Sequence, residues 1–233
     1  MSVLPPSSFA PFATKRQLAA LYRIASELFL YPEDRQDETV IAGLLDLSDA
    51  PSALSEPVSA FIAEPRGRDL DEYLTILELS PPCPLYLGSY LFDEPKSCLG
   101  AGLSSRNGYM LEVAATYRHF GLEIGPKELA DFLPTMVEFL AISLHLPERD
   151  SIGLRRRFIE RCFRPGLKPM REALAKYGSP YGLLVTALET AVEADTVLHA
   201  ADPVWSPPTR KGRPPTPPVF TYSGRQSGDS SGE

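Results

Sequence analysis

The sequence predicts an all-α protein, and three observations support this prediction. Apolar residues recur at the i, i+3, i+4, i+7 spacing of amphipathic helices through most of the chain. Helix-start and helix-stop residues bracket these segments. No stretch shows the clean alternation of apolar and polar residues that marks a half-buried strand. The expected fold is a single-domain helical bundle of about 8–10 helices, followed by a disordered Pro/Gly/Ser-rich C-terminal tail.

The first expected helix begins after Thr14, because Thr14-Lys-Arg-Gln17 matches the capping-box pattern. Its core face is apolar and comprises Leu18, Leu21, Tyr22, Ala25, Leu28 and Phe29. Pro32 halts it. Weaker helical patterns cover about 37–47, 51–63 and 69–79.

The segment 106–120 has the pattern of another helix, with Gly121 as its left-handed C-terminal cap. A helix running from Pro126 would contain Pro134 in its interior, which costs about 3 kcal/mol. We therefore expect this helix to begin with Asp131 as N-cap, so that Pro134 falls in the first turn. Further helices are expected at about 151–163, 166–177 and 180–200, the last with Ser179 as cap and Pro180 at its first position.

Composition divides the chain into three parts: a flexible N-terminus at 1–13, an all-α domain at 14–201 and a disordered tail at 202–233. The tail contains the run PPTPP, which is typical of polyproline ligands, although a plain extended tail is the favoured interpretation. No run reaches the roughly 18–20 apolar residues of a membrane helix. At the N-terminus the positive charge follows the apolar residues, the reverse of a secretory signal, so we expect a cytoplasmic protein.

The net charge of −7 argues against binding to duplex nucleic acid. The charge is unevenly distributed, because residues 64–146 hold twelve acidic and six basic residues while 147–176 hold nine basic and four acidic. This bipolar pattern suits a charged partner, although a solvated surface is the commoner explanation. The arginine run, formed by Arg155, Arg156, Arg157, Arg161 and Arg164, is interpreted as a solvated helix face.

The sequence predicts no catalytic residue and no metal site, and thus a protein that is not an enzyme. His119, His145 and His199 are far apart and match no HExxH pattern, and GxSxG and Walker-type motifs are missing. The three cysteines are odd in number and lack CxxC spacing, which argues against disulfides and structural zinc. The remaining enzymatic alternative is Cys83 as a nucleophile, but its neighbours Pro82 and Pro84 provide no base.

The segment 78–95, ELSPPCPLYLGSYLFDEP, is unusual because it combines four prolines with three aromatic residues. It forms either the wall of a peptide groove or a long loop packed onto the helices, and the sequence favours neither. An acidic stripe would lie on one helical face if the helix were continuous, and it comprises Glu128, Asp131 and Glu138 with Thr135 between them. N-capping by Asp131 and solvation of the glutamates is the plain alternative.

Three blocks in order, YLTILELSPPCPLYLGSY at 73–90, AATYRHFGLE at 114–123 and ELADFLPTMVEFLA at 128–141, resemble the NarJ/TorD/DmsD family. These proteins are the nitrate reductase delta-subunit type chaperones for molybdenum enzymes. The resemblance spans roughly residues 15–200. Family members often have Pro-Asp-His where this chain has Ala130-Asp131-Phe132, so no role of that histidine is carried to Phe132. This difference resembles the branch that serves type II dimethyl sulfoxide reductase-like enzymes, such as ethylbenzene, dimethyl sulfide, selenate or chlorate oxidoreductases.

The resemblance implies a cytoplasmic chaperone, either a monomer or a homodimer, dedicated to the catalytic subunit of a molybdenum oxidoreductase. It would bind the N-terminal segment of that subunit, often a twin-arginine export signal, until bis-molybdopterin guanine dinucleotide and usually an iron–sulfur cluster are inserted. Those cofactors belong to the client, so none is expected to bind stably here, and cofactor-delivery proteins are further expected partners.

A basic, apolar peptide needs acidic residues beside an apolar trough, so the expected binding residues are Tyr86, Tyr90, Tyr117, Glu128, Asp131 and Glu138. The chaperone interpretation competes with a structural subunit or adaptor of a redox complex, and with a Cys83-dependent enzyme.

Overall fold

The computed structural model describes residues 13–93, 104–125, 128–147, 150 and 153–205. Within these residues the fold is all-α, as the sequence predicts: they contain no strand, and one isolated antiparallel bridge joins Tyr86 to Phe132. No helix in this described part is both long enough and apolar enough to cross a lipid bilayer. The expected tail lies outside the described residues from 206 onward, and the expected flexible N-terminus lies outside them up to residue 12.

The helices of the first half are α1 (Lys15–Leu28), α2 (Asp37–Asp46), α3 (Ser52–Ala63) and α4 (Leu70–Tyr73). Those of the second half are α6 (Ser105–His119), α7 (Leu133–Ser143), α8 (Leu154–Phe158), α9 (Arg164–Lys176) and α10 (Tyr181–Leu198). Two 3-10 turns, Pro65–Arg68 and Leu87–Tyr90, and two π-helical turns, Leu74–Glu78 and Ile159–Phe163, complete the described helical structure.

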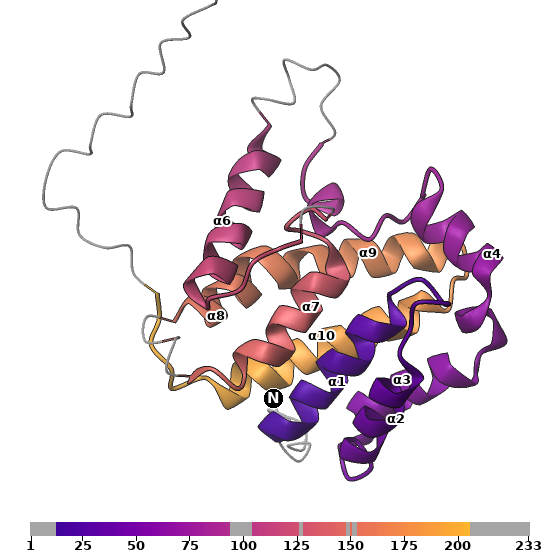
Figure 1. Ribbon diagram of the computed structural model, residues 1–233, viewed down its shortest axis with the longest axis horizontal. Helices are drawn as coiled ribbons and strands as arrows, with labels where there is room; N and C mark the ends of the chain where they lie inside the picture. The colour runs from indigo at the N-terminus through magenta and orange to yellow at the C-terminus, as the bar shows by residue number, and fades with distance from the viewer. Residues whose placement is uncertain (1–12, 94–103, 126–127, 148–149, 151–152, 206–233) are drawn as a thin grey trace, which may run out of the picture.

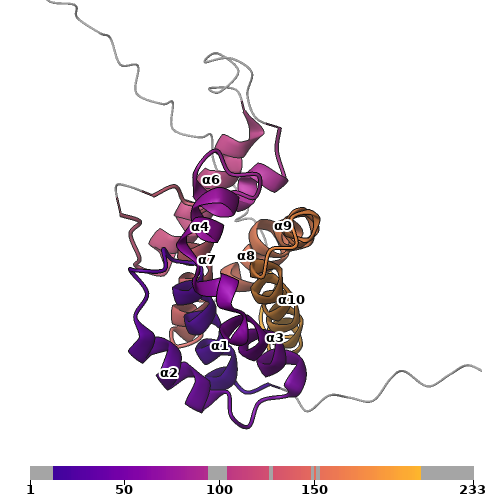
Figure 2. The ribbon, with the colours of Figure 1, turned by 90° about the vertical axis from the view of Figure 1, so that its right-hand side faces the viewer.

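Helix α1 is the centre of the bundle and packs against α2, α7 and α10 (Figures 1 and 2). Helix α10 in turn contacts α3 and α9. The central position of α1 follows from its wide apolar face, which leaves Leu18, Leu21 and Ile24 fully buried. Helix α2 comes close to α1 because residue 43 is glycine: a Cβ there would lie 2.5 Å from Cγ1 of Ile24.

The expected cap at the start of α1 is confirmed. The Thr14 hydroxyl accepts a hydrogen bond from the Gln17 N–H at 3.2 Å, and the Gln17 side chain accepts one from the Thr14 N–H at 2.9 Å. The expected end of α6 is confirmed as well, since Gly121 has φ 75°, a conformation that favours glycine. Local start and stop signals therefore set these two helix ends.

Two expected caps are wrong. Helix α7 begins at Leu133 with Phe132 at the N-cap, although Pro134 does fall in the first turn as expected. Asp131 does not cap it because its carboxylate instead bonds to groups far away in the sequence, which are described below. Ser179 is not the cap of α10 either: its hydroxyl donates to Glu72 at 2.7 Å, and Pro180 takes the cap position. Tertiary partners compete successfully with local capping at both sites.

The two helices expected at 151–163 and 166–177 are closely joined. Helix α8 passes through the π-helical turn at 159–163 directly into α9. Pro165 lies within this continuous path, in the first turn of α9 directly after the π-helical turn.

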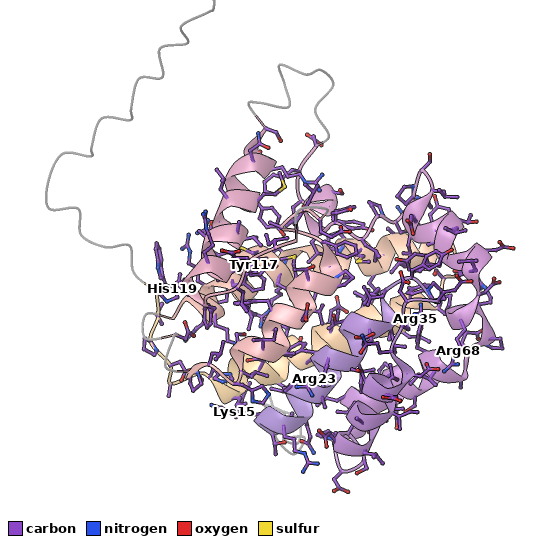
Figure 3. All side chains as sticks on the ribbon, in the orientation of Figure 1. Lys15, Arg23, Arg35, Arg68, Tyr117 and His119 are labelled. Atoms are coloured by element: carbon purple, nitrogen blue, oxygen red, sulfur yellow. The ribbon has the colours of Figure 1, made fainter. Side chains whose placement is uncertain are left out.

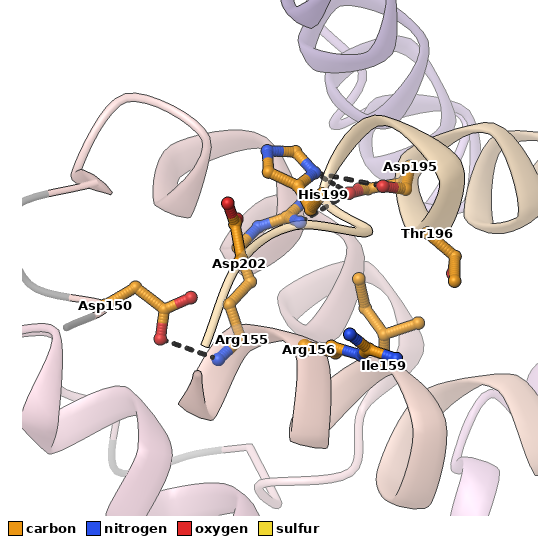
Figure 4. A pocket seen from close by; sticks show the side chains of 8 residues that line it. All are labelled: Asp150, Arg155, Arg156, Ile159, Asp195, Thr196, His199 and Asp202. Carbon is orange, nitrogen blue, oxygen red and sulfur yellow. Dashed lines mark hydrogen bonds and ion pairs between the residues drawn. The ribbon is translucent and has the colours of Figure 1, made fainter. Parts of the chain in front are cut away.

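The arginine run is not a solvated face throughout, because Arg155 is buried between helices. Its guanidinium forms a bidentate ion pair with Asp195 of α10, with both N–O distances 2.6 Å, and donates to the Ser143 hydroxyl of α7 at 2.8 Å. The Tyr22 hydroxyl of α1 donates to the same aspartate at 2.9 Å. His199 lies beside this pair (Figure 4). The network therefore joins α1, α7, α8 and α10 through polar groups inside the core.

Candidate functional site

A groove of about 610 Å³ lies next to the proline-rich segment, between the end of α1, helix α4 with its π turn, the loop 79–86 and the start of α7. We call it the groove. Its lining is mixed: four aromatic rings, three carboxylates, and leucine and proline side chains. The groove thus combines apolar walls with negative charge.

The rings form two pairs. Tyr31 and Tyr73 meet edge to face with centroids 5.5 Å apart, and Tyr86 and Phe132 lie 5.5 Å apart in a tilted arrangement. Tyr73 is buried and its hydroxyl donates to the Phe29 carbonyl at 3.4 Å, so this ring is held in place. The other three rings are partly exposed. Partly exposed aromatic rings can bury a large apolar area against a ligand, and their side chains lose little conformational freedom when they do so.

The carboxylates of the groove are Asp34, Glu78 and Glu128, and all three residues are exposed. None of the described residues that line the groove is Lys, Arg or His. The Tyr86 hydroxyl donates to Glu128 at 3.3 Å. Burial, together with the nearby Glu128 carboxylate, raises the pKa of Tyr86, so the phenol remains a neutral hydrogen-bond donor. Every ionised side chain that lines the groove is negative.

The loop that forms one wall is fixed to the helices through its backbone. The Cys83 N–H donates to the Ile76 carbonyl at 3.1 Å. Further along, the Leu87 N–H donates to the Asp131 carbonyl at 3.0 Å, and the Leu133 N–H donates to the Leu85 carbonyl at 2.7 Å. These bonds tie the wall to the segment that enters α7. A wall held in this way is preorganised for a ligand.

Asp131 holds this wall from behind. Its side chain is completely buried, and Oδ2 accepts from the Gly88 N–H at 3.0 Å and from the Arg106 guanidinium at 2.9 and 3.1 Å. The other oxygen, Oδ1, has no hydrogen-bond partner among the described residues. Gly88 permits the contact, because a Cβ there would lie 2.3 Å from Asp131 Oδ2. The geometry gives Asp131 a positioning role and leaves it out of reach of a ligand in the groove.

The six residues predicted from sequence lie in three places. Tyr86 and Glu128 line the groove together with Phe132. Asp131 and Tyr90 stabilise the loop behind it: the Tyr90 hydroxyl donates to the Pro84 carbonyl at 3.0 Å, and burial raises its pKa.

Tyr117 and Glu138 line a separate cavity of about 170 Å³ between α6, α7 and the segment 122–124. The Tyr117 hydroxyl donates to the Ala130 carbonyl at 3.1 Å, and its ring packs against Phe139. Figure 3 labels Tyr117 on α6. Tyr117 is therefore part of the core, while Glu138 is exposed at the surface. These two residues do not join Tyr86 and Glu128 in one lining.

The sequence reasoning missed Tyr31, Asp34, Tyr73 and Glu78 as groove residues. Tyr31 precedes Pro32 and Asp34 follows it by two positions, where the sequence indicates only a helix stop, and Tyr73 falls within the expected helical pattern 69–79. An aromatic and an acidic residue beside a helix stop are a weak signal of a binding surface. The packing of α1 against α7 brings Tyr31 and Asp34, which follow α1, into one lining with Glu128.

Cys83 does not have the surroundings of a nucleophile. Its side chain is fully buried, and this burial raises the pKa of the thiol, whereas an activated cysteine needs a lowered one. The described residues also contain no group of three or more His, Cys, Asp or Glu side chains able to hold a metal ion.

No protein-family model matches the chain, and no curated protein matches it. The interpretation of the groove therefore relies on the side chains that line it and on their contacts. The chemistry of the groove has three elements: paired rings, carboxylates without a neighbouring cation in the lining, and a wall fixed by backbone hydrogen bonds.

Proposed function

We propose that the groove binds an extended peptide that is both basic and apolar, and that the protein is a chaperone for the N-terminal segment of the catalytic subunit of a molybdenum oxidoreductase. One observation carries the proposal. Asp34, Glu78 and Glu128 surround a surface of four aromatic rings, and no described residue of the lining is basic. A peptide with arginines beside apolar residues complements both properties.

Two exposed leucines directly follow groove carboxylates in the sequence. Leu79 follows Glu78 and is 65% exposed, and Leu129 follows Glu128 and is 48% exposed. Arginine side chains of a bound peptide would pair with the carboxylates while its apolar residues cover the leucines and rings.

The assignment of the client rests on the resemblance to the NarJ/TorD/DmsD chaperones, whose quoted blocks supply Tyr73, Glu78, Tyr86 and Glu128 of the groove. In this proposal the protein acts in the cytoplasm and holds the catalytic subunit until its molybdenum cofactor, and usually an iron–sulfur cluster, is inserted. The client carries these cofactors. Twin-arginine export signals are basic and then apolar, so they have the chemistry that the groove complements.

Purification of the full-length protein from cells tests this proposal, with co-purifying proteins identified by mass spectrometry. We expect a cofactor-free molybdoenzyme catalytic subunit that is lost when its N-terminal segment is deleted. Recovery of only the mature, cofactor-loaded complex would instead identify a structural subunit. Recovery of no molybdoenzyme under conditions where one is expressed would contradict the client assignment.

A further inference from the structure

We infer that the groove also binds a segment of this same chain, the basic and proline-rich residues 210–218, so that the protein's own tail competes with its client peptide. The competition rests on the proposed function, whereas the contact between tail and groove does not. Three properties support the inference: the chemistry of the segment, the point at which the tail leaves the helical domain, and its reach.

The segment has the chemistry that the groove complements. Arg210, Lys211 and Arg213 place three positive charges within four positions, and no acidic residue occurs between 206 and 228. PPTPP follows directly at 214–218. Proline-rich segments adopt an extended helix that loses little entropy on binding, and they dock in grooves lined by aromatic rings, frequently with a basic residue beside the prolines. The groove offers aromatic rings and carboxylates together.

The beginning of the tail is fixed to the domain at α8. Trp205 lies over the Arg157 guanidinium with 3.9 Å from the guanidinium carbon to the ring centroid. Pro203 packs so closely on Gly153 that a Cβ on the glycine would lie 1.9 Å from the Pro203 carbonyl oxygen. Arg157 is itself held by Glu112 of α6 at 2.7 Å. Figure 1 shows this end of the described chain beside α6 and α8, across the molecule from α4.

The segment can reach the groove from this anchor. The basic residues 210–213 follow Trp205 by five to eight positions and Pro218 follows it by thirteen, which corresponds to about 15–25 Å and about 40 Å at roughly 3.1 Å per residue of extended polyproline helix. The nearest part of the groove lies on the α6 side: Trp205 borders Thr116 of α6, and the neighbouring Tyr117 bonds to Ala130, two residues from the groove residue Glu128. The basic residues are therefore placed to meet Glu128, and the longer proline run that follows them extends along the groove. A tethered segment of this kind acts at an effective concentration of about a millimolar, which makes a weak contact competitive.

Crosslinking of the full-length protein tests the contact directly. A water-soluble carbodiimide joins the Lys211 amine to a carboxylate within contact distance, and mass spectrometry locates the bond. Mixing unlabelled with ¹⁵N-labelled protein distinguishes bonds within one chain from bonds between two. We expect Lys211 joined to Glu128, within single chains only. Absence of this bond, or its formation only between differently labelled chains, would overturn the inference.

Competition supplies the second measurement. The full-length variant Arg210→Glu/Lys211→Glu/Arg213→Glu should bind a labelled peptide, two adjacent arginines followed by an apolar stretch, about tenfold more tightly than the wild type. Arg225→Glu, a charge reversal in the same tail beyond the proline run, should leave that affinity unchanged. Equal affinity of the triple variant and the wild type would overturn the competition. Because the crosslink needs no client peptide, failure of the peptide to bind any of these chains would count against the proposed function alone.

Discussion

The Asp131 carboxylate accepts a hydrogen bond from the backbone N–H of Gly88 at 3.0 Å, across 43 positions of sequence. Arg106, at the start of α6, donates to the same oxygen. A loop, a helix start and the segment entering α7 thus meet at one buried oxygen. The groove lies on the other side of this loop, so its shape depends on a contact that no ligand touches.

Replacing Asp131 should destabilise the fold and weaken peptide binding together. Asp131→Ala removes the partner of Arg106 and of the Gly88 N–H, both of which lie in a largely buried setting. We expect a loss of about 2–3 kcal/mol in the free energy of unfolding, measured by urea titration. Asp49→Ala, at an exposed aspartate, is the control and should change it by less than about 0.5 kcal/mol. Equal stability of the two variants would contradict the positioning role.

Gly88 and Gly108 form a matched pair that tests the same contact. A Cβ at Gly88 would lie 2.3 Å from Asp131 Oδ2 and 2.8 Å from Arg106 Nε, so Gly88→Ala should cost about 2 kcal/mol. A Cβ at Gly108 meets no atom within 4 Å, and this residue lies inside α6. Gly108→Ala should therefore stabilise the protein by about 0.5–1 kcal/mol. Thermal unfolding of both variants should give a lower melting temperature for Gly88→Ala and a higher one for Gly108→Ala. Melting temperatures that shift in the same direction would contradict the packing described.

Tyr31 was not recognised from sequence, and it provides a test of the groove that is independent of the predicted residues. Tyr31→Ala removes one ring of the lining while leaving the buried Tyr73 in place. We expect about tenfold weaker binding of a basic, apolar peptide, because ring burial is a main contribution in such sites. Tyr177→Ala removes a tyrosine that is 51% exposed outside the groove lining, and it should leave the affinity as in the wild type. Fluorescence anisotropy of a labelled peptide measures both.

The Arg155–Asp195 pair should be a main determinant of stability. Asp195→Ala leaves a buried guanidinium without its carboxylate and the Tyr22 hydroxyl without its acceptor. We expect a loss of about 3–5 kcal/mol, which lowers the melting temperature by roughly 10 °C for a domain of this size. Circular dichroism on heating measures it. A change of only a few tenths of a kcal/mol would show that the pair is not buried as described.

His199 should make stability depend on pH. Its Nδ1 lies 2.8 Å from Asp195 Oδ1, and the hydrogen bond to this carboxylate raises the pKa of the imidazole. Burial alone would raise the pKa of Asp195, but the bonds from Arg155 and His199 outweigh it and lower that pKa to about 2. The stabilisation from His199 is therefore complete below its unfolded pKa of about 6.5 and is lost as the pH rises through the higher folded value.

The variant His199→Gln isolates this effect. We expect the difference in unfolding free energy between the wild type and the variant to be largest near pH 6 and to shrink as the pH rises toward 9. Urea titrations at a series of pH values measure it. A difference that stays constant or grows with pH would contradict the ion pair.

Local sequence signals predicted the helices well because their determinants are local. The capping box at Thr14 and the left-handed Gly121 act within a few residues, so both are readable from the chain alone. Asp131 and Ser179 are also residue types that commonly cap helices, yet their side chains bond to Gly88 and Glu72. Sequence spacing carries no information about such distant partners.

The candidate site was only partly predictable for the same reason. Tyr86 and Glu128 were identified, and the structure brings them together in the groove. Tyr117 satisfies the same compositional criteria but packs into the core. Arg155 was interpreted as solvated because arginine usually is, and only the aspartate on α10 explains its burial. The alternative left open for the segment 78–95 has a mixed answer: Tyr86 lines the groove, whereas Tyr90 packs the loop.

The central claim is that the carboxylates of the groove bind a basic, apolar peptide. The most direct measurement is a calorimetric titration of such a peptide, with two adjacent arginines before an apolar stretch, into the wild type and into Glu78→Gln/Glu128→Gln. Glu56→Gln/Glu193→Gln, at two exposed glutamates outside the groove lining, carries the same change in charge as the control. The account predicts binding to the wild type and the control, and affinity reduced at least about tenfold in the groove variant, with all three equally stable. Equal affinity of the groove variant and the control, or no binding to the wild type, would contradict it.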